Sequence, residues 1–261
     1  MSSRHAVRAF CLVACLAAAL ACAAESERPS PLKPGSAFVG ADVRALQQDD
    51  FANPGMHWVA RGETLWKSNR DGEKSCASCH GDAAVSMKGA ATRYPRIDPG
   101  SARLVNLEGR INLCRVRHQQ AAPYAYESDE LLSLTAYLAY QSRGMPSAIE
   151  IDAQNGRHFE RGREFYYRRQ GQMNLACAHC HQQNWGRHLR TETITQGHGT
   201  DYPAYRFEWQ TLGSLHRRFR SCLYGIRAAM LPAGSPEFLD LELYLAWRAK
   251  GLPIDAPGVR R

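Results

Sequence analysis

Two short motifs of the form Cys-x-x-Cys-His constrain this sequence more than any other feature. They are CASCH at residues 76–80 and CAHCH at residues 177–181. In this pattern the two thiols add to the vinyl groups of a haem, and the next histidine ligates the iron. The alternative is a zinc-binding or redox Cys-x-x-Cys that has a histidine next to it by chance. This alternative is less favoured when the complete motif occurs twice. We therefore expect two covalently bound haem c groups. The residues that would hold them are Cys76, Cys79, His80, Cys177, Cys180 and His181.

The sequence around these motifs is repeated. The segments HWVARGETLW and HFERGREFYY precede the motifs, and LEGRINLC and LHRRFRSC follow them. Each copy ends on a helix-like stretch, ELLSLTAYLAYQSRGMP in the first and EFLDLELYLAWRAKGLP in the second. Landmarks recur in the same order about 100 residues apart, which is longer than a solenoid period and typical of a duplicated domain. Apolar residues at helical spacing then predict a mainly α fold of two tandem cytochrome c-like domains related by internal duplication.

The N-terminus reads as a secretion signal. Arg4 and Arg8 precede an apolar run at residues 9–21, and small residues suitable for cleavage follow. The run is too short to span a bilayer, and no later stretch qualifies. A lipoprotein reading at Cys15 or Cys22 is weaker, because Cys15 is too early and Cys22 lacks a leucine three residues before it. We expect export to the periplasm with cleavage near residues 23–24. The expected segments are a signal peptide at 1–24, an extended N-terminal arm at 25–45, a first cytochrome c domain at 46–150 and a second, catalytic one at 151–261.

Positive charge is concentrated in the second repeat. Residues 46–150 carry 12 basic and 12 acidic side chains, whereas residues 151–261 carry 16 and 10. Such an excess attracts nucleic acid, an anionic small molecule or an acidic protein. The sequence contains no nucleic-acid-binding module and no long run of Lys or Arg, so an anion or an acidic protein is the expected partner.

One cysteine pair, Cys114 and Cys222, remains after the signal segment and the haem motifs are set aside. Both fit the pattern L-x-x-R-x-x-x-C at equivalent places in the repeat. A thiolate is a soft ligand that favours ferric iron and lowers its reduction potential, so we favour both cysteines as distal iron ligands. Two alternatives stay open: a Cys114–Cys222 disulfide, or a distal ligand from Met230 or a histidine such as His118 or His216.

Arginines gather next to Cys222. Arg218 lies one helical turn before it, and Arg110 holds the equivalent place before Cys114. A guanidinium there binds either a haem propionate or a sulfur oxyanion. We favour the propionate for Arg110 and substrate for Arg218, whose surroundings are more basic. Arg248 replaces Gln141 of the first repeat and is a weaker substrate candidate, with a solvated helix face as the alternative.

The paired motifs with their distal cysteines, together with RRFRSC around Cys222, resemble the SoxA family, the dihaem subunits of the SoxAX cytochromes of bacterial thiosulfate oxidation. The resemblance covers roughly residues 46–253. It implies a periplasmic L-cysteine S-thiosulfotransferase that joins thiosulfate to a cysteine of the SoxYZ carrier and passes two electrons through haem. It also implies a heterodimer with SoxX, a small monohaem cytochrome c. Cys222 would be the catalytic group, found as a persulfide in the family, and Arg218 would bind substrate.

Rival functions remain for a dihaem chain of this kind. A plain electron-transfer cytochrome would use a Met or His ligand and would not need the arginines. A thiosulfate dehydrogenase would act on free thiosulfate without a carrier. A peroxidase needs an open iron site, which two cysteine ligands oppose.

Overall fold

The computed structural model describes residues 27–69 and 73–261, which fall into two units. The predicted signal peptide and its cleavage site lie outside the described residues. Of the first unit, Met1–Leu32, the described residues 27–32 contain no helix or strand. Lys33–Arg261 form one compact unit, and the predicted domain boundary near residue 150 lies within it.

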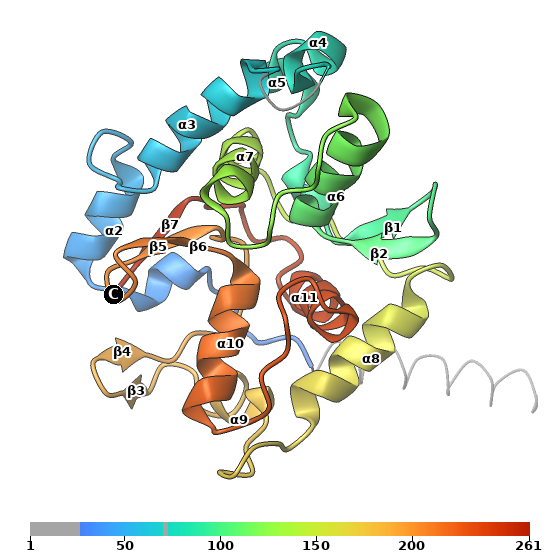
Figure 1. Ribbon diagram of the computed structural model, residues 1–261. Helices are drawn as coiled ribbons and strands as arrows, with labels where there is room; N and C mark the ends of the chain where they lie inside the picture. Colours follow the sequence, from blue (N-terminus) through green and yellow to red (C-terminus); the bar gives the residue numbers. More distant parts are fainter. Residues whose placement is uncertain (1–26, 70–72) are drawn as a thin grey trace, which may run out of the picture. The chain divides into compact units, whose positions relative to one another are not determined.

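Helices form most of the regular structure in this compact unit (Figure 1). This agrees with the mainly α prediction. The α-helices are α2 (Ala41–Gln48), α3 (Met56–Lys67), α4 (Cys76–His80), α5 (Ala83–Ser86), α6 (Leu107–Cys114), α7 (Asp129–Tyr140), α8 (Gly156–Tyr167), α9 (Cys177–His181), α10 (Leu215–Gly225) and α11 (Pro236–Arg248). Short 3-10 helices are η1 (Gly35–Phe38) and η2 (Ala91–Arg93), and η3 (Arg115–Gln119) is a π-helix.

Two helix pairs dominate the packing: α3 against α7 and α8 against α11. A glycine makes each crossing close. A Cβ atom on Gly62 would lie 2.1 Å from the carbonyl oxygen of Ser133, and one on Gly162 would lie 2.0 Å from that of Asp240. Apolar side chains of α3, α6 and α7 form one core cluster, and those of α8, α10 and α11 form another. The helices predicted before each haem motif and at the end of each repeat are therefore present and paired.

The two cysteine-bearing helices begin in the same way. Asn106 caps α6 by accepting a hydrogen bond from the Gly109 N–H, and Ser214 caps α10 by accepting one from the Arg217 N–H. Each cysteine follows its cap by the same number of residues, so Cys114 and Cys222 leave their helices at equivalent points.

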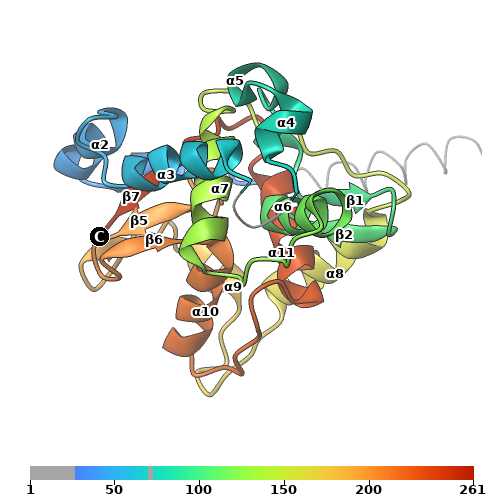
Figure 2. The same cartoon turned by 45° about the horizontal axis from the view of Figure 1, so that its top comes forward.

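Short antiparallel hairpins, which the sequence did not predict, precede both of these helices. Strand β1 (Arg96–Asp98) pairs with β2 (Arg103–Val105), and β5 (Ala204–Arg206) pairs with β6 (Thr211–Gly213). Strand β7 (Gly258–Arg260) lies parallel to β5, which completes the order β6-β5-β7 (Figure 2). A further small hairpin joins β3 (His188–Leu189) to β4 (Glu192–Thr193). Thr195, which follows β4, lies beside the second haem motif, where its carbonyl oxygen is 2.9 Å from His181 Nδ1.

The structure differs from the sequence predictions at two chain segments. The expected arm at 25–45 is not extended throughout, because it contains η1 and the start of α2. Helix α2 is held by Gln47, whose side chain bonds Val259 and Arg260 at the C-terminal strand. The helix-like stretch at the end of each repeat is only partly helical: its helix stops four residues before Gly144 in the first repeat and three before Gly251 in the second, and both glycines take a positive φ in the following turn. No helix within residues 27–69 and 73–261 has the length and apolar character needed to cross a membrane.

Candidate haem-binding and substrate site

The second Cys-x-x-Cys-His motif forms the whole of helix α9 and presents a correctly oriented histidine. The Nδ1 atom of His181 lies 2.9 Å from the carbonyl oxygen of Thr195. A carbonyl only accepts hydrogen bonds, so Nδ1 carries the proton and Nε2 keeps its lone pair. Hydrogen bonding of this kind orients the histidine ligands of metals. His181 is therefore arranged as an iron ligand.

Cys222 of α10 meets His181 within hydrogen-bonding contact, which brings the predicted pair of axial ligands together. Burial alone would raise the pKa of the Cys222 thiol. The charge of Arg218, the hydrogen bond with His181 and the more distant Arg206 outweigh burial, and they lower the pKa to about 7. A thiol with this pKa is substantially ionised at neutral pH, and the thiolate is the form that binds iron.

The two attachment cysteines of the motif lie beside Cys222. Burial raises the pKa of Cys177 to about 12, and the nearby Cys222 adds to the effect. The pKa of Cys180 is raised by the same two causes. These thiols are therefore protonated at neutral pH, which suits residues whose sulfur atoms become thioethers rather than metal ligands.

Arg218 faces Cys222 from the same helix, as predicted. The nearby Cys222 is the main cause that raises the pKa of the Arg218 guanidinium. Two carboxylates lie near the Arg218 guanidinium. Glu192 Oε2 is 3.7 Å from Nη2, and Glu208 Oε1 is 3.9 Å from Nη1. These separations are long for ion pairs, and 30% of the side chain is exposed. Arg218 thus presents a cation to solvent directly beside the Cys222 sulfur.

Arg248 is not on a solvated helix face, so that alternative is wrong. It is fully buried because α11 packs against α8, which places its guanidinium over the Tyr166 ring at 4.6 Å from the centroid. Its Nη1 atom also lies 3.4 Å from Oε1 of Gln182, the residue after His181. The buried side chain of Arg248 therefore contacts the residue that directly follows the second haem motif.

The first motif forms helix α4 and lies beside Cys114. Burial raises the pKa of Cys76, a hydrogen bond from Gln119 opposes the change, and Cys114 reinforces it. Trp66 packs on His80 at 5.7 Å between ring centroids. In contrast to Arg218, Arg110 donates directly to Asp98, at 2.9 Å, and only 1% of the Asp98 side chain is exposed. The two arginines of equivalent position thus have different partners.

The alternatives for Cys114 and Cys222 find no support in the geometry. All six cysteines of the described ranges are free, so no Cys114–Cys222 disulfide forms. Both ring nitrogens of His216 are engaged, Nε2 with Glu242 at 2.9 Å and Nδ1 with the Gly234 N–H at 2.9 Å. His118 and Met230 are exposed to solvent. Within residues 27–69 and 73–261, no cluster of three or more acidic, His or Cys side chains could hold a separate metal ion.

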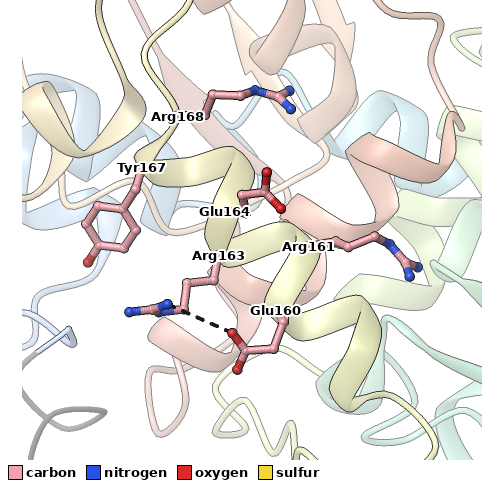
Figure 3. A pocket seen from close by; sticks show the side chains of 6 residues that line it. All are labelled: Glu160, Arg161, Arg163, Glu164, Tyr167 and Arg168. Carbon is pink, nitrogen blue, oxygen red and sulfur yellow. Dashed lines mark ion pairs between the residues drawn. The ribbon is translucent and has the colours of Figure 1, made fainter.

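An open hollow on the outer face of α8 is a different feature (Figure 3). Its lining consists of Glu160, Arg161, Arg163, Glu164, Tyr167 and Arg168. Its charges are partly paired already, since Arg161 binds Asp240 at 2.6 Å and Arg163 lies 3.9 Å from Glu160. None of its lining residues is His181, Arg218 or Cys222, so it is not the candidate site.

Sequence reasoning missed several residues of the site, namely Glu192, Thr195, Arg206 and Glu208. They lie in or next to short hairpins, and no local motif marks them. Arg206 alone had an available signal, because it occupies the place in the repeat that Asp98 occupies in the first copy.

Known proteins share both the motifs and this fold. A family model for the SoxA/TsdA cytochrome c domain matches residues 61–147. The chain is similar to L-cysteine S-thiosulfotransferase subunit SoxA of Pseudaminobacter salicylatoxidans, with 41% identity over 229 residues, 87% of this chain and 80% of that protein. The same subunit of Rhodovulum sulfidophilum is 36% identical over 236 residues, covering 90% and 82%. The crystal structure of SoxXA from P. pantotrophus contains a similar chain, with TM-score 0.84, 34% identity, and coverage of 88% and 87%.

The motif helices, the ligand geometry and the matched domain define a c-type cytochrome with covalently bound haem c. The similarity extends well beyond that domain, over most of both compared sequences. The chain belongs to the SoxA family.

Proposed function

We propose that this chain is the SoxA subunit of an L-cysteine S-thiosulfotransferase. It joins thiosulfate to a cysteine of the SoxYZ carrier and passes electrons to a SoxX-like small monohaem cytochrome c, with which it forms a heterodimer. The names of the relatives support the activity, and the likeness to a chain of SoxXA supports the partner. The observation that carries the proposal is that Cys222 is hydrogen-bonded to His181 and lies within the electrostatic reach of Arg218.

The difference between the two arginines favours a reaction in the second half. Arg110 is neutralised by the buried carboxylate of Asp98, which also accepts from Arg117 at 2.8 Å. Arg218 has only long contacts to partly exposed carboxylates. A thiosulfate dianion is attracted to a guanidinium that keeps its charge, so Arg218 rather than Arg110 binds substrate. Arg248 is fully buried next to Gln182, so it is a weaker contributor that acts through its charge rather than by touching the substrate.

The chemistry balances as an oxidation. The carrier thiol loses its proton, its sulfur bonds to the outer sulfur of thiosulfate, and two electrons leave while every S–O bond stays intact. Arg218 holds the sulfonate charge and directs the outer sulfur toward Cys222. When bound, haem c supplies an acceptor for single electrons next to this sulfur. The low pKa of Cys222 keeps its thiolate available at neutral pH.

The proposal includes two haems and two tandem domains, at 46–150 and 151–261. Equivalent helix crossings at Gly62 and Gly162 and equivalent caps at Asn106 and Ser214 support an internal duplication. The axial ligand pairs would be His80 with Cys114 and His181 with Cys222, and the attachment residues Cys76, Cys79, Cys177 and Cys180. The signal-like N-terminus supports a periplasmic location.

Replacing the Cys222 sulfur tests this function directly. The holoprotein with its SoxX-like partner, SoxYZ and thiosulfate should yield a carrier one thiosulfonate heavier by mass spectrometry. Cys222→Ala should lower the conjugation rate by about a thousandfold or more, while both haems stay covalently attached. The matched control is Cys114→Ala, which should keep the rate within about tenfold because it alters only the first site.

Three results would contradict the proposal. Conjugation that survives Cys222→Ala would remove Cys222 from the reaction. An equal loss of conjugation rate in both variants would show that the reaction does not depend specifically on the site in the second half. Tetrathionate formed from free thiosulfate, with an unmodified carrier, would indicate a thiosulfate dehydrogenase instead.

A further inference from the structure

Arg206 is a buried cation to which the mechanism above gives no role beyond a minor share in lowering the pKa of Cys222. It ends strand β5, and it is only 3% exposed. Its Nη2 atom donates to Glu192 Oε1 at 2.5 Å and to the carbonyl oxygen of Arg261 at 2.7 Å, and its Nε atom donates to Glu208 Oε1 at 2.9 Å. Charged side chains are rarely buried without a function or a partner. Here the partners are two glutamates.

The same two glutamates face the substrate arginine. Glu192 turns its other oxygen, Oε2, toward Arg218 at 3.7 Å, and Glu208 lies 3.9 Å away. Arg206 therefore makes the short, charge-assisted hydrogen bonds with the two glutamates, whereas Arg218 makes only long contacts with them. The four side chains form a group of two cations and two anions, in which the anions are already engaged.

We propose that Arg206 is a positioning residue that holds Glu192 and Glu208, so that Arg218 stays available to an anionic substrate. This inference rests on the proposed function, because it concerns how the same site binds thiosulfate. Without Arg206, two carboxylates would face one guanidinium, and the local charge would become negative. Arg218 would then turn toward the glutamates, and a dianion would be repelled. Arg206 is too buried to touch the substrate itself.

The first repeat contains the opposite arrangement at the same place. Strands β1 and β5 pair with β2 and β6 in the same register, and Asp98 and Arg206 are the equivalent last residues of their strands. Asp98 binds Arg110 directly, whereas Arg206 binds the carboxylates near Arg218. The sign of the charge at this one strand end thus decides whether the neighbouring arginine is neutralised or left available.

The test separates substrate binding from turnover in the holoprotein. Arg206→Gln should raise the KM for thiosulfate, and its Kd measured by calorimetry without the carrier, by about tenfold, with kcat within about threefold. Arg206→Lys keeps the charge without the separate donors of the guanidinium, and should raise KM less than Arg206→Gln does. Adding Glu192→Gln and Glu208→Gln to Arg206→Gln should return KM to within about threefold of the wild type, because the competing charges are gone.

Each other outcome counts against the inference. An unchanged KM in Arg206→Gln would show that Arg218 does not need Arg206. A raised KM that the added glutamine substitutions do not lower would show that the glutamates are not the cause. If Arg206→Gln does not fold, Glu208→Gln alone decides: a KM within about threefold of the wild type supports the inference, because Arg206 already engages Glu208, and a large fall in KM, which would show that Glu208 competes for Arg218 even with Arg206 present, overturns it. A wild-type protein that binds thiosulfate but does not conjugate it would contradict the proposed function instead.

Discussion

At the scale of single residues, the second site depends on which charges surround one sulfur atom. Burial pushes the pKa of the Cys222 thiol up, and the charge of Arg218, the hydrogen bond with His181 and the charge of Arg206 together push it down further than burial raises it. The nearby Cys222 in turn is the main cause of the raised pKa of Arg218. Cys222 and Arg218 therefore support each other's ionised state, as expected for a thiolate that binds iron beside an anion-binding cation.

Arg218→Gln should weaken substrate binding more than any other single charge removal on α10. We expect the KM for thiosulfate to rise by about tenfold to a hundredfold, the usual value of a lost charge-assisted contact of about 1.5–3 kcal/mol. The matched control is Arg220→Gln, an exposed residue of the same helix, which should leave KM within about twofold. Steady-state conjugation assays measure both, and equal KM values for the two variants would contradict the assignment.

The haem motifs and the orphan cysteines were predictable from the sequence because their spacing is local and repeated. The contact of Cys222 with His181 followed from the same pattern. The repeat could have drawn attention to the position of Arg206, but its pairing with Glu192 was not predictable, because separate short hairpins bring the two residues together and no local pattern encodes that contact. The burial of Arg248 was missed for a related reason: it ends its helix, where a charged residue usually meets solvent, but α8 covers it.

At the scale of elements, the pairing of α8 with α11 depends on one glycine. A Cβ on Gly162 would clash with the backbone carbonyl of Asp240 at 2.0 Å, and backbone cannot move aside as a flexible side chain can. The equivalent crossing of α3 and α7 has the same requirement at Gly62. Each helix pair contributes to a core cluster that also includes residues of the adjacent haem motif. The spacing of the two helices therefore affects the position of that motif.

Gly162→Ala should therefore destabilise the protein, although alanine favours helix. We expect a loss of about 2–3 kcal/mol in the free energy of unfolding, since overpacking exceeds the gain of about 1 kcal/mol from helix propensity. Gly156→Ala in the same helix is the control, because its Cβ would meet nothing within 4 Å. It should be neutral or slightly stabilising. Urea unfolding followed by circular dichroism measures both, and a stable Gly162→Ala variant would refute the clash.

At the scale of the whole compact unit, a buried polar cluster joins the two halves. Glu108 of α6 is 8% exposed and faces Glu242, His216 and Glu127. Asn106 donates to Glu242 at 3.1 Å, and His216 lies 2.9 Å from the same carboxylate. Burial, followed by repulsion from Glu242, raises the pKa of Glu108 to about 8. The cluster therefore contains a carboxyl group that is protonated at neutral pH.

This cluster predicts a pH-dependent stability. An unfolded Glu108 loses its proton near 4.5, whereas the folded one keeps it to about 8, so the folded state binds more protons between these values and stability falls as the pH rises. Glu108→Gln imitates the protonated form. It should gain about 4 kcal/mol over the wild type near pH 8 and only about 1 kcal/mol near pH 5.

Chemical unfolding of the holoprotein at the two pH values measures the effect. The control is Glu160→Gln, an exposed residue of α8, which should show no such gain. A Glu108→Gln variant that is less stable at the higher pH would show that Glu108 is ionised in the folded protein.

The capping residues of the two cysteine-bearing helices both bond to carboxylates of this buried polar cluster. Asn106 bonds Glu242, and the Ser214 hydroxyl bonds Glu127, a residue from the other half. Cutting the chain at the repeat boundary would leave Glu108 and Glu127 without His216 and Ser214, and would open the acids to water. A shortened protein that keeps a single haem motif therefore cannot be made by simple trimming, and its designer would first have to rebuild the surface that the missing half covered.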